Sequence, residues 1–189
     1  KGFKNGIPIF LGYLAVSFTF GIAARSGGLS SLEAILISAT NLTSAGQLAA
    51  VPIIVSGGTF VELAVSQLVI NLRYSLMSVS LSQNLGKSVR LIDRFLISFV
   101  NTDEVFAVAT AQKRQVGRKY LYGLILTPYL GWSFGTFLGA AAGDILPSFI
   151  TSALGLAIFG MFVAIVVPDA RKSRPIALCA VCSAALSCL

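Results

Sequence analysis

Residues 95–111 read FLISFVNTDEVFAVATA, an apolar stretch with two polar and two acidic residues at its centre. Residues 31–56 read SLEAILISATNLTSAGQLAAVPIIVS, with apolar flanks around a centre of small and amide side chains. Each stretch is long enough for a membrane helix, yet its centre carries groups that hydrocarbon penalises. Irregular backbone within a membrane is tolerated only where it faces protein or water. The two stretches therefore predict broken or re-entrant helices.

The rest of the chain has the composition of a membrane protein. Of its 189 residues, 56% are hydrophobic and 11% charged, whereas soluble domains carry about 25% charged residues. A hydrocarbon core of about 30 Å needs about 20 helical residues. We expect an all-α, polytopic integral membrane bundle of about five to seven membrane segments, forming a single domain over residues 1–189. The expected segments are residues 7–24, 31–56, 59–82, 95–111, 120–142, 149–167 and a truncated 176–189.

The basic residues lie mainly in the connectors, and their distribution favours one topology. The net charge is +7, and Lys and Arg concentrate on the cytoplasmic side of membrane proteins. If all segments cross fully with the amino terminus inside, the basic connector 87–94 falls outside. If segments 31–56 and 95–111 instead return to their own sides, only Arg25 is outside and Arg73 is within the membrane. We therefore favour two re-entrant segments that enter from opposite sides, as an inverted repeat would produce.

Segment 59–82 carries candidate substrate-binding residues. Asn71 and Arg73 lie near its middle, and a charge there costs at least about 2.5 kcal/mol on insertion scales. Arg73 must therefore face a wet cavity or a carboxylate. We predict that Asn71 and Arg73 bind substrate. The alternative is a structural Arg73, paired with Glu62 or with an acid of 103–104 to hold helices together.

The acidic residues are candidates for proton coupling. Asp103 and Glu104 are adjacent in an apolar stretch, and both burial and a like-charged neighbour favour protonation of a carboxylate. We assign Asp103, Glu104 and Glu62 to this role. The alternatives are a solvated connector for the first two and an interfacial position for Glu62, which lies near the end of its segment.

The polar centre of segment 31–56 adds Ser44, Gly46 and Gln47 to the candidate substrate-binding residues. A broken helix exposes N–H and C=O groups that can bind an amino-acid zwitterion without a full side-chain charge. The alternative is a kink with a helix-packing role only.

Four glycines recur every four residues near the end of segment 120–142, which clears one helix face for close approach of another helix. These helix-packing residues are Gly131, Gly135, Gly139 and Gly143. Trp132 lies beside them, and we predict that it forms a wall of the substrate cavity; an interfacial position is the alternative.

Enzyme, metal and nucleic-acid functions find little support in the sequence. His is absent, which excludes a Ser-His-Asp triad, and no metal-ligand spacing is present. No nucleophile–base pair or complete P-loop stands out. We expect no enzyme activity, cofactor, metal or nucleic acid, and we expect a gradient or a separate subunit to supply energy.

Four motifs resemble the AzlC-type permease family, and their order and spacing match over most of the chain. The motifs are Thr43-Ser-Ala-Gly-Gln-Leu-Ala-Ala50, Asn71-Leu-Arg-Tyr-Ser-Leu-Met-Ser78, Thr102-Asp-Glu104, and Gly131-Trp132 followed by Gly135-Thr136 and Gly139. Where the family usually has His after the Arg, this chain has Tyr74, so a role of that imidazole does not transfer.

The resemblance implies the large subunit of a two-component exporter of branched-chain amino acids, a multi-pass protein of the bacterial inner membrane. It also implies a small hydrophobic partner of the AzlD type and proton-linked export. A homo-oligomer is left open. Two other classes remain: a passive channel, which re-entrant hairpins also suit, and a non-transporting scaffold subunit.

Overall fold

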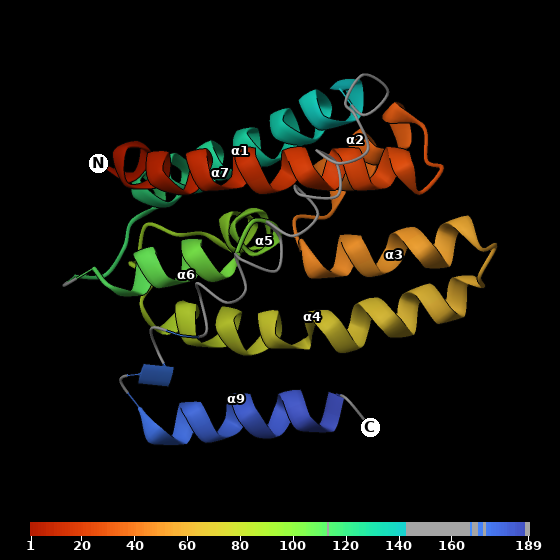
Figure 1. Ribbon diagram of the computed structural model, residues 1–189. Coiled ribbons are helices and arrows are strands. Elements are labelled where there is room, and N and C mark those ends of the chain that lie inside the picture. Colours follow the sequence, from red (N-terminus) through yellow and green to blue (C-terminus); the bar gives the residue numbers. More distant parts are fainter. Residues whose placement is uncertain (113, 143–166, 168–169, 172, 188–189) are drawn as a thin grey trace. The chain divides into compact units, whose positions relative to one another are not determined.

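The computed structural model describes residues 1–112, 114–142, 167, 170–171 and 173–187, and the chain divides into two compact units, Lys1–Leu146 and Pro147–Leu189. The described residues form helices and no strands, which confirms the all-α prediction for them. Segment 149–167, apart from Val167, and Gly143 lie outside the described residues. The helices of the first unit are α1 (Gly2–Ser26), α2 (Ser31–Thr40), α3 (Ala45–Val55), α4 (Phe60–Gln83), α5 (Leu91–Phe99), α6 (Asp103–Thr110) and α7 (Arg118–Ala142), and the second unit contains α9 (Arg174–Ser187) (Figure 1).

Both helix breaks fall at the polar centres of the two stretches. Residues 41–44 separate α2 from α3, and residues 100–102 separate α5 from α6. At the first break, Ser44 has a φ of 36°, a left-handed value that is uncommon outside glycine. Backbone strain of this kind costs about 1–3 kcal/mol and persists where the surrounding structure holds it. The surrounding structure therefore holds Ser44 in this conformation, and the first break is a defined part of the fold.

Each broken pair of helices returns to the end of the unit from which it started. Gly27, just before α2, packs against Val51 of α3. The N–H of Gly86, before α5, donates to the carbonyl of Val116, after α6, at 2.9 Å. Figure 1 shows both pairs as hairpins that enter the unit from opposite ends. The arrangement has the geometry of the re-entrant topology, while the number of membrane crossings stays a prediction.

Two helices extend beyond the expected membrane segments, whose limits stay a prediction. The fourth segment was expected to start at Phe95, but α5 begins at Leu91, because the Asp93 carboxylate accepts a hydrogen bond from the backbone N–H of Arg90 at 2.8 Å. Likewise α1 begins at Gly2 instead of Ile7. By length and hydropathy alone, α1 and α7 are the two described helices that could each span a membrane.

Helices α1 and α7 pack closely along the glycine-rich face of α7. A Cβ at Gly131 would lie 2.8 Å from the carbonyl oxygen of Phe10, and one at Gly135 would lie 2.5 Å from that of Leu14. Distances this short leave no room for a side chain. The described glycines of this face thus allow the backbones of α1 and α7 to approach closely, as small residues do in membrane helix pairs.

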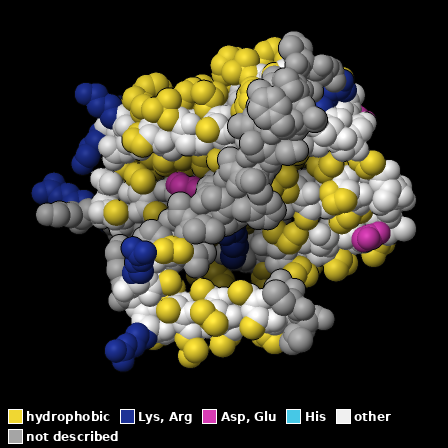
Figure 2. Space-filling view, in the orientation of Figure 1, with side chains coloured by type: hydrophobic (Ala, Val, Ile, Leu, Met, Phe, Trp, Pro, Cys, Tyr) yellow, Lys and Arg dark blue, Asp and Glu magenta, His cyan; other side chains and the backbone are white. Residues whose placement is uncertain are grey.

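The outer surfaces of the first unit are apolar. On α4, Phe60, Leu68 and Leu76 are each more than half exposed, and Figure 2 shows hydrophobic side chains over the same region. A soluble domain would hide side chains of this size, whereas in a bilayer they are solvated by lipid. Figure 2 also shows Lys and Arg side chains concentrated at the end of the unit where α1 begins, the end expected to be cytoplasmic.

Candidate functional site

Amide side chains surround the first helix break. The Gln67 side chain on α4 donates from Nε2 to the carbonyl oxygen of Gly46, at 2.8 Å. Its Oε1 accepts from Asn71 Nδ2 at 3.1 Å and from Asn41 Nδ2 at 3.4 Å. Three amides thus bind one another and the backbone of the first turn of α3, which fixes α3 against α4. Gln67 was not among the residues predicted from sequence.

A second polar chain joins three helices in the interior. Gln47 Nε2 on α3 donates to Ser38 Oγ on α2 at 3.1 Å. Ser38 Oγ lies 2.7 Å from Thr136 Oγ1 on α7. All three side chains are fully buried. Gln47 therefore lies inside the protein, as a substrate-binding residue requires.

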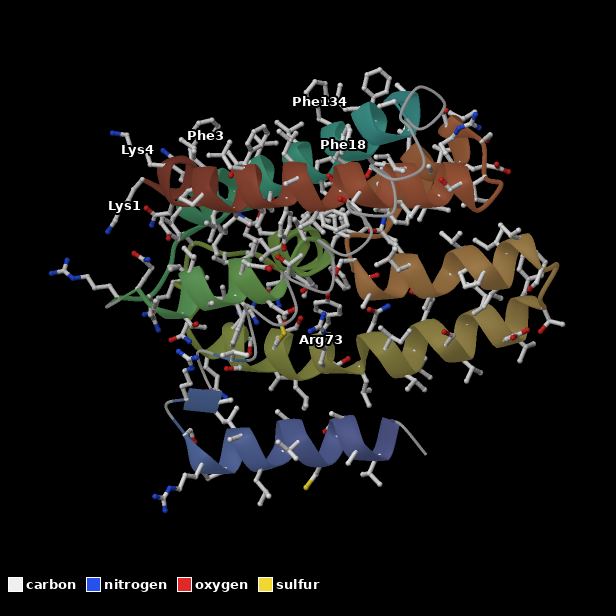
Figure 3. All side chains as sticks on the ribbon, viewed as in Figure 1. Lys1, Phe3, Lys4, Phe18, Arg73 and Phe134 are labelled. Carbon is white, nitrogen blue, oxygen red and sulfur yellow. The ribbon has the colours of Figure 1, made fainter. Side chains whose placement is uncertain are left out.

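At the second break, Arg73 of α4 reaches the first residue of α6. Its Nη1 lies 2.8 Å from Asp103 Oδ2, and the two side chains are 43% and 33% exposed. Its guanidinium also stacks on the ring of Tyr74, with Cζ 4.9 Å from the ring centroid. Figure 3 labels Arg73 on the middle of α4. Of the partners considered from sequence, Asp103 is the one that Arg73 contacts.

Glu104 has a different partner, Tyr13, which was not among the residues predicted from sequence. The hydroxyl of Tyr13 on α1 donates a hydrogen bond to Glu104 Oε2. The ring of Tyr13 meets Trp132 of α7 edge to face, with centroids 5.2 Å apart. Both aromatic residues are buried. The only signal in the sequence was a tyrosine in an apolar helix, whose hydroxyl needs a partner once buried.

The two breaks meet beside the middle of α7. Leu42 of the first break and Val100 of the second belong to the same buried apolar cluster as Trp132. The hydroxyl of Tyr129, also on α7, donates to the carbonyl of Ala39 at 3.2 Å, at the end of α2. Phe99, at the end of α5, has its ring 6.5 Å from that of Tyr129. Residues 129–132 are therefore the point at which the two hairpin tips converge.

Several buried polar atoms near this point have no hydrogen-bond partner among the described residues. An unsatisfied buried polar group costs about 1–3 kcal/mol, so such atoms mark places where a polar ligand or water is accommodated. The amide oxygens of this set are acceptors suited to an ammonium group. The atoms are Thr43 Oγ1, Gln47 Oε1, Asn71 Oδ1, Asn101 Oδ1, Thr102 Oγ1, Trp132 Nε1 and Ser133 Oγ.

Two of the predicted residues lie at the ends of helices. Glu62 is in the first turn of α4, where its N–H donates to Thr59 Oγ1 at 3.1 Å. It precedes Arg73 by eleven residues, which is about 16 Å along a helix at 1.5 Å per residue. Glu62 therefore does not join the group formed by Arg73, Asp103 and Glu104. Ser44 precedes α3 without capping it through its side chain.

Comparisons with known proteins agree on the class of protein. A family model described as "AzlC protein" matches residues 8–146. The chain is 26% identical to "Inner membrane protein YgaZ" of Escherichia coli (strain K12), over 99% of this chain and 79% of the relative. It is 32% identical to an "Uncharacterized membrane protein" of Archaeoglobus fulgidus, over 90% of this chain and 75% of the relative. A Helicobacter pylori (strain J99) protein of the same description is 24% identical, over 92% and 78%. No solved structure matches the chain.

Proposed function

Because the chain belongs to the AzlC family of membrane proteins, we propose that it is a secondary transporter that exports branched-chain amino acids across the bacterial inner membrane. The proposal includes a proton gradient as energy source and a small AzlD-type membrane subunit as partner. Its main support is the meeting of two broken helices beside α7, where buried polar atoms have no hydrogen-bond partner among the described residues. Transporters commonly bind substrate at broken helices near the bilayer midplane.

The chemistry of the site suits a small apolar zwitterion. Arg73 can bind the substrate carboxylate, because a guanidinium presents a planar fork of donors. The side-chain oxygens of Gln47, Asn71 and Asn101, which have no partner in the described part of the chain, can accept hydrogen bonds from the ammonium. Apolar side chains line the same region, with Leu42, Val100 and Trp132 in one cluster. That cluster offers an aliphatic side chain a dry environment.

The ion pair between Arg73 and Asp103 connects substrate binding to protonation. A substrate carboxylate that binds Arg73 competes with Asp103 for the guanidinium. A carboxylate that loses its cationic partner binds a proton more readily. Glu104, held by Tyr13, is a neighbouring proton acceptor in the same turn of α6. Proton binding and substrate binding thus take place at the same site, the ion pair and the neighbouring Glu104.

The test is transport by the purified full-length protein in proteoliposomes, alone and with its small partner. Counterflow of labelled leucine, isoleucine, valine and methionine is measured with and without a pH difference. We expect accumulation against the substrate gradient when a pH difference is present, and its loss when an uncoupler is added.

Two outcomes would assign the protein to another class. Flux that only equilibrates and ignores the uncoupler would identify a passive channel. Absence of flux for all four amino acids, with and without the partner, would leave a non-transporting scaffold.

A further inference from the structure

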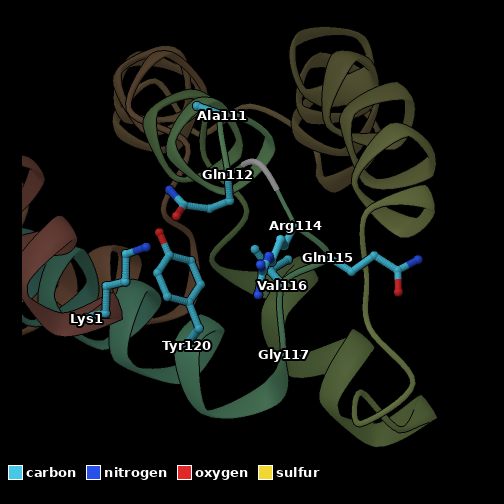
Figure 4. A pocket seen from close by; sticks show the side chains of 8 residues that line it. All are labelled: Lys1, Ala111, Gln112, Arg114, Gln115, Val116, Gly117 and Tyr120. Atoms are coloured by element: carbon cyan, nitrogen blue, oxygen red, sulfur yellow. The ribbon is translucent and has the colours of Figure 1, made fainter.

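Four cationic side chains line one pocket at the end of the first unit where α5 and α7 begin. The pocket has a volume of about 620 Å³, and its lining residues are Lys87, Ser88, Arg90, Gly117, Arg118, Lys119 and Tyr120. A second pocket, of about 600 Å³, shares Gly117 and Tyr120 with it and adds the cations Lys1 and Arg114 (Figure 4). This end of the unit therefore presents a continuous basic cavity surface.

Among the described residues, Asp93 is the one acid that forms an ion pair with these cations, and it pairs with Arg118 alone. Asp93 is fully buried and does not line the pocket. Its Oδ1 accepts from the hydroxyl of Tyr122 at 2.6 Å and pairs with Arg118 Nε at 3.0 Å. Within the described part of the chain, neither Lys87 nor Lys119 forms an ion pair. The pocket thus keeps an excess of positive charge.

Helix geometry adds to this positive potential. Helix α7 has Arg118 and Lys119 in its first turn and no acid there, and Arg90 immediately precedes α5. The amino-terminal end of a helix carries partial positive charge, so cations there repel it. An anion bound between the two helix starts relieves that repulsion. Phosphate suits such a place, since its oxygens accept several charge-assisted hydrogen bonds.

Apolar surface next to the pocket indicates an amphiphilic ligand. Leu91, Ile92 and Phe95 follow Arg90 on α5, and they are 72%, 62% and 68% exposed. We propose that the pocket lined by Lys87, Arg90, Arg118 and Lys119 binds the phosphate of an anionic phospholipid. The acyl chains of the lipid lie along the exposed apolar residues of α5. Basic pockets between helices on the cytoplasmic side bind such headgroups.

The experiment compares lipid binding by three forms of the full-length protein: wild type, Lys87→Gln/Lys119→Gln, and Lys4→Gln. Lys4 is an exposed cation of α1 that lines neither pocket, so it is the matched control. Retention of phosphatidylglycerol or phosphatidylcholine is measured by native mass spectrometry. The melting temperature is measured with each lipid, with inorganic phosphate and with glycerol phosphate.

We expect wild type and Lys4→Gln to retain phosphatidylglycerol in preference to phosphatidylcholine and to melt at a higher temperature with it. Each of the two pocket lysines should contribute about fivefold in affinity for phosphatidylglycerol. Three results would overturn the proposal: equal retention of both lipids, equal weakening by Lys4→Gln, or equal stabilisation by inorganic phosphate or glycerol phosphate. The last would identify a site for a soluble anion.

Discussion

Arg73, in the middle of α4, and Asp103, the first residue of α6, form an ion pair whose Nη1 and Oδ2 atoms are 2.8 Å apart. The pair joins α4 to the second helix break. Because both side chains are partly exposed, a substrate carboxylate can reach the guanidinium and compete with Asp103. The pair is therefore the first place at which to test the proposed site.

Arg73→Ala should strongly reduce export while the protein still reaches the membrane. Loss of a hydrogen bond to a charged group costs about 1.5–3 kcal/mol, which corresponds to a rate about 10- to 100-fold lower. The export rate is measured as leucine efflux from loaded vesicles. The control is Arg94→Ala, which removes an exposed Arg of α5 that forms no ion pair with a described residue. Undiminished efflux in Arg73→Ala would refute the site assignment.

The exchanged pair Arg73→Asp/Asp103→Arg separates a structural role from a binding role. It keeps opposite charges facing each other, so we expect a melting temperature close to that of wild type. The guanidinium would then project from α6 instead of α4, and we expect export to stay strongly reduced. Recovery of export in the double variant would mean that the pair only holds the helices together.

Glu104→Gln should uncouple the transporter from the proton gradient. The amide can still accept a hydrogen bond from Tyr13, so local packing is kept, but it cannot bind a proton. We expect exchange of labelled for unlabelled leucine to continue, and accumulation driven by a pH difference to disappear. Glu33→Gln, which alters an exposed acid of α2, is the control. Accumulation that survives in Glu104→Gln would exclude this residue from coupling.

Gly139→Ala should destabilise the pair of α1 and α7. The new Cβ would lie 2.7 Å from the carbonyl carbon of Phe18 and closer still to its oxygen. Overpacking of this kind costs about 1–3 kcal/mol. Gly12→Ala is the matched control, because among the described residues no atom outside the surrounding turns of α1 lies within 4 Å of a Cβ at that position. The melting temperatures of both variants are measured in detergent. That of Gly139→Ala should be lower than that of wild type, and that of Gly12→Ala should be equal or higher. Equal changes in the melting temperature of the two variants would contradict the close approach of α1 and α7.

The positions of both breaks could be predicted because polar side chains interrupt long apolar runs, and hydrocarbon penalises such groups. That Arg73 faces either a wet cavity or an acid could be predicted for the same reason. Which acid it contacts could not, since the tip of the second hairpin is placed by packing between distant segments. Tyr13 was missed because its partner Glu104 lies 91 residues away along the chain, and a single tyrosine in an apolar helix has no periodic pattern. The separation of Glu62 from Arg73, in contrast, follows from helix rise alone.

Asp93 should make stability depend on pH in the acid range. It precedes Phe95, where the membrane segment was expected to begin. Hydrogen bonds from Tyr122 and from the Arg90 backbone, together with the charge of Arg118, lower the pKa of Asp93 in the folded protein. Its contribution to the free energy of unfolding is therefore complete above its unfolded pKa of about 3.9 and is lost as pH falls through the lower folded value.

Melting temperatures of wild type, Asp93→Asn and Tyr122→Phe between about pH 3 and pH 7 measure this contribution around the unfolded pKa of about 3.9. At neutral pH we expect Asp93→Asn to melt below wild type, because the amide cannot pair with Arg118 in the same way. As the pH falls, wild type should lose stability faster than Asp93→Asn, so the two curves converge. Tyr122→Phe removes the hydroxyl that donates to Asp93 at 2.6 Å. The folded pKa of Asp93 is then less lowered, so the curve of this variant should fall by a smaller amount and level off at a higher pH than that of wild type. Parallel curves for all three proteins would mean that Asp93 does not link α5 to α7 through its charge.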